Sequence, residues 1–320
     1  MVLNKRKVIP KEELHFIELL EKNAKKEIHI KSLENNRIVN LSINKCGIES
    51  IPEEIGNLEY LEEIYLVEPR VSQLPKSIGN LKNLKYITIF KTPIKELPNS
   101  FGNLNNLKAL TITRANLEKI PDSIYKLKNL KDLKLNENNI REIPMKISNL
   151  INLESFIFDD NKLEEFPDSI TKCALLEIIQ FNNNLIKNIP KSIENLKKLV
   201  SISFNNTQLT EFSKYFCNLS NLVAIELTDN KISVIPDCIG NLTNLGRLYL
   251  SNNNISNIPR SIINLKETLA LQLQNNNITE FPEVLTSLSI RELDLRGNPL
   301  DKYPNKIGKA KIVEEKWYSW

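Results

Sequence analysis

The residue types most often used in catalysis and metal binding are few in this 320-residue chain and lie apart from one another. Its two histidines, His15 and His29, have no cysteine at a metal-ligand spacing. A catalytic histidine–cysteine pair would require Cys46 to approach one of them. The phosphate-binding patterns G-x-x-x-x-G-K-S/T and G-x-G-x-x-G do not occur. We therefore expect a protein that is not an enzyme and that holds no cofactor and no metal.

Three aspartates offer the best alternative to that expectation. Asp159 and Asp160 are adjacent, and Asp229 is predicted to lie on the same open surface. General acid–base catalysis would need one of these carboxyl groups to leave water, so that its pKa shifts. An open surface is wet, so solubility is the better explanation for the three carboxylates. An enzyme that used them would need a metal ion bound to the folded protein.

The balance of charge and hydropathy argues against several kinds of partner. The chain carries 43 lysines and arginines against 39 aspartates and glutamates, a net charge of +4. Lysines are interspersed with glutamates, so no basic stripe forms and we expect no nucleic-acid partner. Apolar runs fall short of about 18 residues, so we expect no membrane span. The opening residues, MVLNKRKVIPKEEL, lack the apolar segment of a secretory signal.

The cysteines and the missing signal together predict the location of the protein. Cys46, Cys173, Cys217 and Cys238 form no C-x-x-C motif and do not gather at either end. Because disulfides are rare in reducing compartments, we predict free, buried thiols and a cytoplasmic protein. The alternative is a secreted protein, if a signal peptide preceded this sequence in the gene.

One segment, LKDLKLNENNIREIP at residues 130–144, recurs through most of the chain. When each copy is numbered from its first apolar residue, apolar side chains occupy positions 1, 4, 6, 11 and 14, asparagine position 9 and proline position 15. The twelve copies begin at Ile38, Leu61, Leu84, Leu107, Leu130, Leu153, Leu176, Leu199, Leu222, Leu245, Thr268 and Ile290. Ten intervals are 23 residues and the last is 22. Positions 4 and 6 point to one side of an extended strand, so each copy predicts a strand followed by a turn.

The asparagine at position 9 is expected to be buried and to bond the backbone where the chain turns away from the strand. It is present as Asn138, Asn161, Asn184, Asn230, Asn253, Asn276 and Asn298. It is replaced by Cys46, Pro69, Thr92, Ala115 and Thr207. The first four repeats all lack the amide, so we predict that their turns are less regular or filled by water.

The unit resembles leucine-rich repeats of the 23-residue type, written I-P-x-x-I-G-N-L-x-x-L-x-x-L-x-L-x-x-N-x-I, and is fullest at residues 235–255 and 51–66. It is similar to the intracellular Ras-group leucine-rich repeat proteins and their prokaryotic relatives. The resemblance implies an α/β solenoid, a horseshoe with a parallel β-sheet on its concave face and loops or short 3₁₀ turns on its convex face. A role in intracellular signalling and a small GTPase as partner come from this resemblance alone.

The predicted organisation is a cap at residues 1–37, twelve repeats at residues 38–304 and a second cap at residues 305–320. The first cap is expected to be a helix, from the apolar spacing within residues 11–26, followed by a strand. The second is expected to be a helix carrying Ile312 and Val313. Its segment Trp317–Trp320 is either an aromatic lid on the last repeat or a docking tail.

Residues at positions 3, 5, 7 and 8 should face the concave side, where most of them are small or polar. The predicted partner-binding residues are Tyr65, Val67, Tyr86, Phe90, Lys91 and Arg114, then a weaker cluster of Lys134, Ile157, Ile178 and Gln180, and a third of Arg247 and Tyr249. In the first group, rings of adjoining repeats lie beside cations, which is the composition of interface hot spots. The alternative is that the rings only pack against each other across strands, worth about 0.2–1 kcal/mol per pair.

We therefore predict a monomeric, non-enzymatic scaffold that binds a partner protein on its concave face. The alternative is a secreted or surface-exposed adhesin or effector that binds host proteins.

Overall fold

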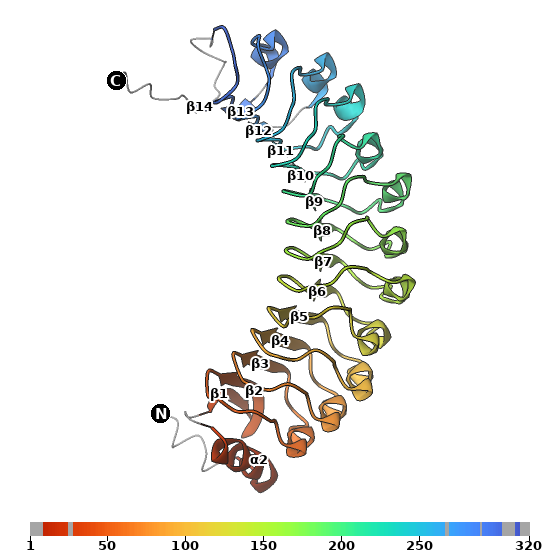
Figure 1. Cartoon of the computed structure of the whole chain (residues 1–320). Helices are drawn as coiled ribbons and strands as arrows, with labels where there is room; N and C mark the ends of the chain where they lie inside the picture. Colours follow the sequence, from red (N-terminus) through yellow and green to blue (C-terminus); the bar gives the residue numbers. More distant parts are fainter. Residues whose placement is uncertain (1–8, 25–27, 266–268, 289, 303–310, 314–320) are drawn as a thin grey trace, which may run out of the picture. The chain divides into compact units, whose positions relative to one another are not determined.

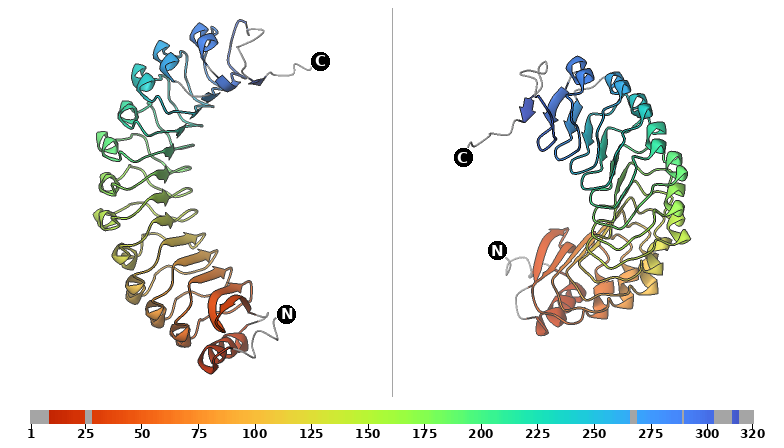
Figure 2. Two further views of the ribbon diagram at one scale, coloured as in Figure 1. Left: turned by 180° about the vertical axis from the view of Figure 1, so that it is seen from behind. Right: turned by 45° about the horizontal axis from the view of Figure 1, so that its top comes forward.

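This computed structural model describes residues 9–24, 28–265, 269–288, 290–302 and 311–313. The chain falls into two compact units, Met1–Asn161 and Lys162–Trp320. Within each unit, strands run side by side along one face, called here the sheet face, and short 3₁₀ helices line the opposite face (Figure 1 and Figure 2). Each unit is therefore a solenoid of stacked turns.

The first unit begins with helix α2 (Lys11–Lys22) and strand β1 (His29–Glu34). Its other strands are β2 (Arg37–Asn44), β3 (Glu63–Val67), β4 (Tyr86–Phe90), β5 (Ala109–Thr113), β6 (Asp132–Lys134) and β7 (Ser155–Ile157), and its 3₁₀ helices are η1 (Glu53–Asn57), η2 (Lys76–Asn80), η3 (Asn99–Asn103), η4 (Asp122–Lys126) and η5 (Met145–Asn149). β1 pairs antiparallel with β2. From β2 to β7 the pairing is parallel and joins residues 23 apart, such as Leu41 with Ile64. The sequence period is thus the register of the sheet.

The second unit repeats this arrangement. Its strands are β8 (Ile178–Gln180), β9 (Ser201–Ser203), β10 (Ala224–Glu226), β11 (Arg247–Tyr249), β12 (Leu269–Gln272), β13 (Ile290–Asp294) and β14 (Lys311–Val313), and its 3₁₀ helices are η6 (Asp168–Lys172), η7 (Lys191–Asn195), η8 (Lys214–Asn218), η9 (Asp237–Asn241), η10 (Arg260–Asn264) and η11 (Glu283–Ser287). All of its strand pairs are parallel. The shorter last interval appears as a register shift between Leu269 and Ala270, where β12 meets β13.

The residue before nearly every 3₁₀ helix is extended and is usually the proline of position 15. Pro52 and Pro75 have φ angles of −62° and −65°, which are the angles that the proline ring favours. Ser213 takes the proline's place ahead of η8, and its φ of −62° is reached without a ring. The proline therefore marks the place where the chain enters the 3₁₀ helix.

The core of each unit is formed by the inward positions of the repeat. In β3, Ile64 and Leu66 alternate with more exposed neighbours and are each 1% exposed. Phenylalanines enlarge the core of the second unit: the rings of Phe181 and Phe204 stack with centroids 5.7 Å apart, and Phe204 lies 6.4 Å from Phe216. Each such side chain contributes about 1.5–3 kcal/mol by its burial.

The asparagine at position 9 is buried and bonds the backbone of two repeats. Nδ2 of Asn138 donates to the carbonyl oxygens of Ile112 and Leu135 at 2.9 Å. Oδ1 of Asn138 accepts from the backbone N–H groups of Ala115 and Leu117 at 3.1 Å. One amide therefore satisfies groups that the turn leaves without a strand partner.

The predicted irregularity of turns without this amide is confirmed only in part. Position 10 has a positive φ at Gly47 (69°), Asn116 (57°) and Gln208 (126°), each directly after a replaced asparagine. Among the described repeats that keep the asparagine, position 10 shows no positive φ. The repeats with Pro69 and Thr92 also show none, so loss of the amide permits the irregular turn without requiring it.

The helix of the N-terminal segment is tied to the first repeat by one buried acid. Glu13 is fully buried, and its Oε2 accepts the backbone N–H of Ile38 at 2.8 Å. Its Oε1 lies 2.5 Å from Nε of Arg37. Phe16 and Ile17 of α2 are fully buried as well.

In the described part of the chain, no helix is long and apolar enough to cross a membrane.

The prediction of a helix around Ile312 and Val313 is wrong, because Lys311–Val313 forms strand β14. β14 pairs in parallel with β13, joining Leu293 to Ile312. β-branched residues favour strands, and the free edge of β13 offers backbone groups for them to bond. The predicted lid or tail at Trp317–Trp320 lies outside the described residues.

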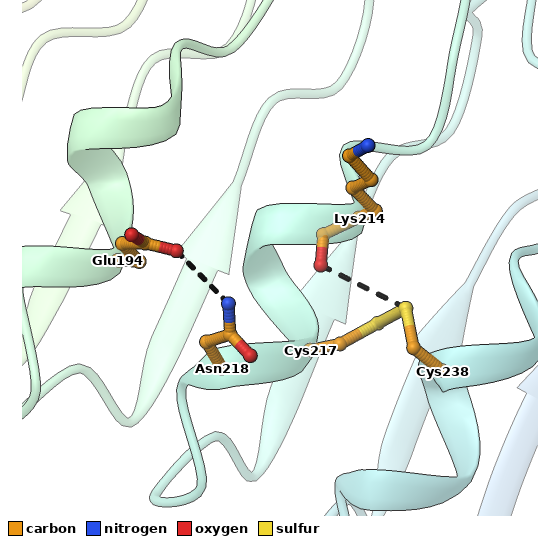
Figure 3. Close-up of a disulfide and its surroundings, with 5 residues drawn as sticks. All are labelled: Glu194, Lys214, Cys217, Asn218 and Cys238. Atoms are coloured by element: carbon orange, nitrogen blue, oxygen red, sulfur yellow. Dashed lines mark hydrogen bonds between the residues drawn. A yellow bond between two sulfur atoms is a disulfide. The ribbon is translucent and has the colours of Figure 1, made fainter.

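The prediction of free thiols is wrong for two of the four cysteines. Cys217 in η8 and Cys238 in η9 form a disulfide, with their Cα atoms 5.7 Å apart (Figure 3). Cys46 and Cys173 are free and buried, as predicted. The sequence conceals the pair because its members are 21 residues apart and become neighbours only when successive 3₁₀ helices stack.

Candidate functional site

The parallel register decides which predicted binding residues lie side by side in the first unit. Tyr65 pairs with Thr88, whereas Tyr86 pairs with Glu63, so the two tyrosines lie in different rows across the strands. Val67 and Phe90 do share a row. The predicted group is therefore three separate places on one face, of which only the Val67–Phe90 pair is a direct cross-strand neighbour.

Tyr65 is held from two sides. Nζ of Lys31, from β1, lies 3.6 Å from the centroid of its ring, a cation–π contact. Its hydroxyl donates to Oε2 of Glu63 at 3.2 Å. Burial, and then the negative charge of Glu63, raise the pKa of Tyr65 above its ordinary value of 10.0. Lys31 lies ahead of the repeats, and the repeat pattern could not place it here.

Phe90 and Tyr86 present the other two rings. The guanidinium of Arg114 lies 5.4 Å from the Phe90 ring centroid, and Nε of Arg114 lies 2.5 Å from Oε2 of Glu137. Glu137 holds the pKa of Arg114 above its ordinary value through a hydrogen bond and its charge. Tyr86 is 40% exposed and is the most open of the three rings. The face thus combines two rings in contact with cations and one open ring.

A row of charged residues runs along the end of these strands. It occupies position 8 of the first five repeats and consists of Lys45, Glu68, Lys91, Arg114 and Glu137, called here the charged row. All five have left-handed backbone, with φ between 49° and 54°. Glu68 lies 3.6 Å from Lys45 and 3.5 Å from Lys91, and Arg114 pairs with Glu137, so each cation of the row has an acidic neighbour.

Position 8 has the same backbone but different side chains in the second unit. The last repeat has Gly297 there, with a φ of 70°, and the five repeats before it have Asn183, Asn206, Asp229, Asn252 and Asn275, called here the amide row. Their φ angles lie between 50° and 58°. Nδ2 of Asn206 donates to Oδ1 of Asn183 at 2.9 Å, and Nδ2 of Asn252 donates to Asp229 at 2.7 Å. Asparagine and aspartate enter this conformation more easily than lysine, arginine or glutamate.

The remaining predicted residues are distributed over both units. In the first unit, Lys134 is exposed and pairs in register with the half-buried Ile157. Ile178 and Gln180 belong to the second unit and are described within it. Ile178 is 37% exposed.

Arg247 and Tyr249 lie in β11 of the second unit. Arg247 is exposed, and Tyr249 is half-buried. Tyr249 lies between Glu226 and Gln272 in its row, so it has no aromatic neighbour there.

Two exposed valines in the second unit were missed by the sequence reasoning. Val200 and Val223 are 37% and 40% exposed and occupy position 2 of successive repeats. The backbone N–H of Val223 donates to the carbonyl of Val200 at 2.8 Å, which places them side by side. A comparison of position 2 along the chain could have found them, because it holds a charged residue in each of the second to seventh repeats, such as Glu62 and Lys85.

Asp229 and Cys46, two of the groups considered for catalysis, have surroundings that do not favour it. Asp229 accepts a hydrogen bond within the amide row. Burial raises the pKa of the Cys46 thiol, and it raises that of Cys173 to about 11, whereas a nucleophilic cysteine needs a lowered pKa. In the described ranges of the chain, no group of three or more His, Cys, Asp or Glu side chains could hold a metal ion.

Sequence and structure comparisons identify the repeat. A leucine-rich repeat region model matches residues 76–158, and a leucine rich repeat model matches residues 205–255 and 243–300. No curated protein sequence matches the chain significantly.

Solved structures with the same fold come from bacteria and plants. A leucine-rich repeat protein of Leptospira interrogans is 26% identical, with a TM-score of 0.74, and the match covers 88% of this chain and 77% of that one. An internalin from Listeria monocytogenes is 21% identical with a TM-score of 0.73 over 96% of both chains, a likeness of fold alone.

A plant peptide hormone receptor, solved in complex with RGF2, is 26% identical with a TM-score of 0.58. The match covers 82% of this chain and about half, 52%, of the receptor. The period, the parallel strands, the buried asparagines and both matching models agree. The chain belongs to the leucine-rich repeat family, whose members typically serve as protein–protein interaction modules.

Proposed function

We propose that this protein recognises a partner protein without catalysis, through the sheet face of its first unit. The observation that carries the proposal is the pairing of two rings with cations, Tyr65 with Lys31 and Phe90 with Arg114, beside the open ring of Tyr86. Aromatic and arginine side chains are enriched in interface hot spots.

The contacts around these rings support a preformed binding surface. Tyr65 is fixed by a hydrogen bond and a cation, so little rotamer freedom would be lost when a partner covers it. The charged row adds a second argument, because Lys91 and Arg114 adopt a backbone conformation that asparagine would adopt at lower cost. Residues kept in an unfavourable conformation cluster at functional sites. The charged row would steer the partner toward this face and set its orientation.

The location and the partner's identity stay predictions. A cytoplasmic, monomeric scaffold that binds a small GTPase rests on sequence features and on the resemblance to Ras-group proteins. A secreted or surface-exposed adhesin or effector is the second candidate, and the Cys217–Cys238 disulfide favours it. Disulfides persist in oxidising compartments and are rare in the cytosol.

Affinity capture with a matched control tests the proposal. The first variant carries Tyr65→Ser, Tyr86→Ser and Phe90→Ser, and the control carries Val234→Ser, an exposed position of the second unit outside the predicted binding clusters. Each is checked for its fold by circular dichroism and used as bait in extracts and on surface-exposed protein fractions of the source cells. We expect a partner that the wild type and the control retain and the triple variant loses by at least tenfold. Equal retention by all three would refute binding at the first unit's sheet face.

A further inference from the structure

The disulfide occupies a contact that recurs between other neighbouring repeats. Position 19 of one repeat lies against position 17 of the next, as Gly56 does against Ser77 and Gly240 against Ser261. A Cβ atom added to these glycines would lie 2.8 Å and 3.0 Å from the serine Cβ atoms. Cys217 and Cys238 hold the same two positions, and their Cα separation of 5.7 Å is ordinary for a disulfide.

The repeat that contains Cys217 lacks the position-9 asparagine and the position-15 proline, and its turn is bonded instead by Oδ1 of Asn230, which accepts the backbone N–H groups of Thr207, Gln208 and Leu209. Thr207 replaces the position-9 asparagine, and its hydroxyl donates to one backbone carbonyl, that of Phe204. Asn230, one repeat later, donates to three carbonyls. Ser213 replaces the proline ahead of η8. Gln208 also has the strained φ of 126°. The bond therefore lies in the repeat, residues 199–221, in which both the position-9 asparagine and the position-15 proline are replaced.

In the reduced state, the thiol of Cys238 would have a hydrogen-bond acceptor close by. Sγ of Cys238 lies 3.7 Å from the carbonyl oxygen of Lys214 (Figure 3). In the disulfide this sulfur carries no hydrogen, but a thiol there would donate to that carbonyl. Ser100 Oγ makes the equivalent bond to the Lys76 carbonyl at 2.6 Å. Both redox states are thus compatible with the local fold.

We propose that the Cys217–Cys238 bond is a redox-sensitive clamp that sets the local stability of residues 199–221. When the bond is closed, it holds η8 against η9 in place of the missing amide and proline. When the bond is open, this repeat unfolds locally more often than its neighbours, and the rest of the unit keeps its structure.

The redox step is thiol–disulfide exchange with a dithiol reductant. A thiolate of the reductant attacks Sγ of Cys238, the more exposed of the two cysteines. The bond to Cys217 breaks, and Cys217 leaves as a thiolate and takes up a proton. The second thiolate of the reductant then displaces Cys238, which is protonated in turn. Two electrons and two protons pass to the protein, and the reductant becomes a disulfide. Closure runs the same steps in reverse with a disulfide oxidant.

The first test determines which thiols are free. The full chain is equilibrated with oxidised and reduced glutathione, denatured without reductant and alkylated. We expect two alkylated cysteines, Cys46 and Cys173, in the oxidising buffer and four after dithiothreitol, with a cross-linked peptide joining Cys217 to Cys238. Four alkylated thiols at every glutathione ratio, or a cross-link to Cys46 or Cys173, would overturn the proposal.

Hydrogen exchange tests the local effect. We expect dithiothreitol to increase amide exchange in residues 201–219 at least tenfold, and to leave residues 247–262 of the same unit within twofold. The double variant Cys217→Ser, Cys238→Ser should show the faster exchange without reductant and no response to it, whereas Cys173→Ala should respond like the wild type. Equal exchange in both redox states, or a rise across the whole unit, would contradict a local clamp.

Discussion

The two units of this protein share one backbone plan but differ at the ends of their strands. Position 8 is left-handed in both, with φ near 50–58° from Lys45 to Asn275. In the second unit, asparagine and aspartate fill it in five repeats and bond to each other, and Gly297 fills it in the last. In the first unit, lysine, arginine and glutamate fill it in five repeats and pair as ions, and Asp160 fills it in the sixth. The fold requires the conformation and is indifferent to the charge, so the charged row carries information beyond the fold.

The interiors of the two units also differ, at position 9 of the repeat. The first four repeats lack the position-9 amide, whereas the repeats of the second unit carry it, except at Thr207. The second unit is therefore fastened internally by amides, and the first relies more on apolar packing and on its surface ion pairs. Surface pairs contribute little to stability. We infer that the surface of the first unit has been shaped for purposes other than stability.

Of the substitutions that test this difference, removal of one buried amide should change the free energy of unfolding most. Nδ2 of Asn253 donates to the carbonyls of Leu227 and Leu250, and its Oδ1 accepts the N–H of Ile232. Asn253→Ala leaves these groups unpaired, at about 1–3 kcal/mol for each buried group. We expect a loss of about 3 kcal/mol or more from the free energy of unfolding, measured by urea denaturation.

Ala115→Asn is the matched control for that experiment, because it introduces an amide at the same position of a first-unit repeat. Its turn already uses a positive φ at Asn116, so we expect little or no gain in the free energy of unfolding. A large gain from this control, or a loss below about 1 kcal/mol for Asn253→Ala, would show that the two units do not differ in their internal fastening.

Exchange of residues between the charged row and the amide row should change the stability of the protein by a moderate amount. Lys91→Asn places a residue that tolerates left-handed backbone where lysine is strained, and we expect it to stabilise the protein by about 1 kcal/mol. Asn252→Lys should destabilise it by a similar amount. Thermal unfolding measures both changes. If Lys91→Asn were destabilising, the ion pair with Glu68 would outweigh the backbone strain, and the row would be structural.

The titration of Tyr65 should give the smallest effect. Burial and the charge of Glu63 raise its pKa in the folded state above 10.0. Folded Tyr65 therefore keeps its proton at a pH where the unfolded chain has lost it. Its contribution to stability is complete below pH 10 and is lost as the pH rises through the folded value.

The difference in tyrosinate absorbance between the wild type and Tyr65→Phe isolates this group. We expect the difference curve to have its midpoint above pH 10. A midpoint at or below the ordinary value would mean that the ring is not held between Lys31 and Glu63 as the structure shows.

Much of the fold could be predicted because the repeat period is also the register of the sheet. The spacing of Leu133 and Leu135 indicated an inward strand, and the period fixed which residue lies beside which. The separation of Tyr65 from Tyr86 follows from the same 23-residue rule, since Tyr65 must pair with Thr88. That part of the site could have been placed correctly from the sequence.

Other features depended on geometry that the period does not contain. The contact of Lys31 with Tyr65 arises where β1 folds back onto β2. To predict the disulfide, one would need the distance between position 19 of one repeat and position 17 of the next, which is set by the stacking of the 3₁₀ helices. β14 formed a strand because an open sheet edge was available, a tertiary influence that local spacing could not reveal.

The side chains of the charged row are evenly spaced, and this spacing limits which ligands can bind along the row. Neighbouring parallel strands lie about 4.8 Å apart, so the row presents one side chain at each such step. Alternate side chains of an extended peptide are about 6.7 Å apart and fall out of phase with the row almost at once. Successive turns of an α-helix rise about 5.4 Å, so a helix drifts from the row by only about 0.6 Å at each step. A ligand that runs along the charged row would therefore match it better as a helix than as a strand.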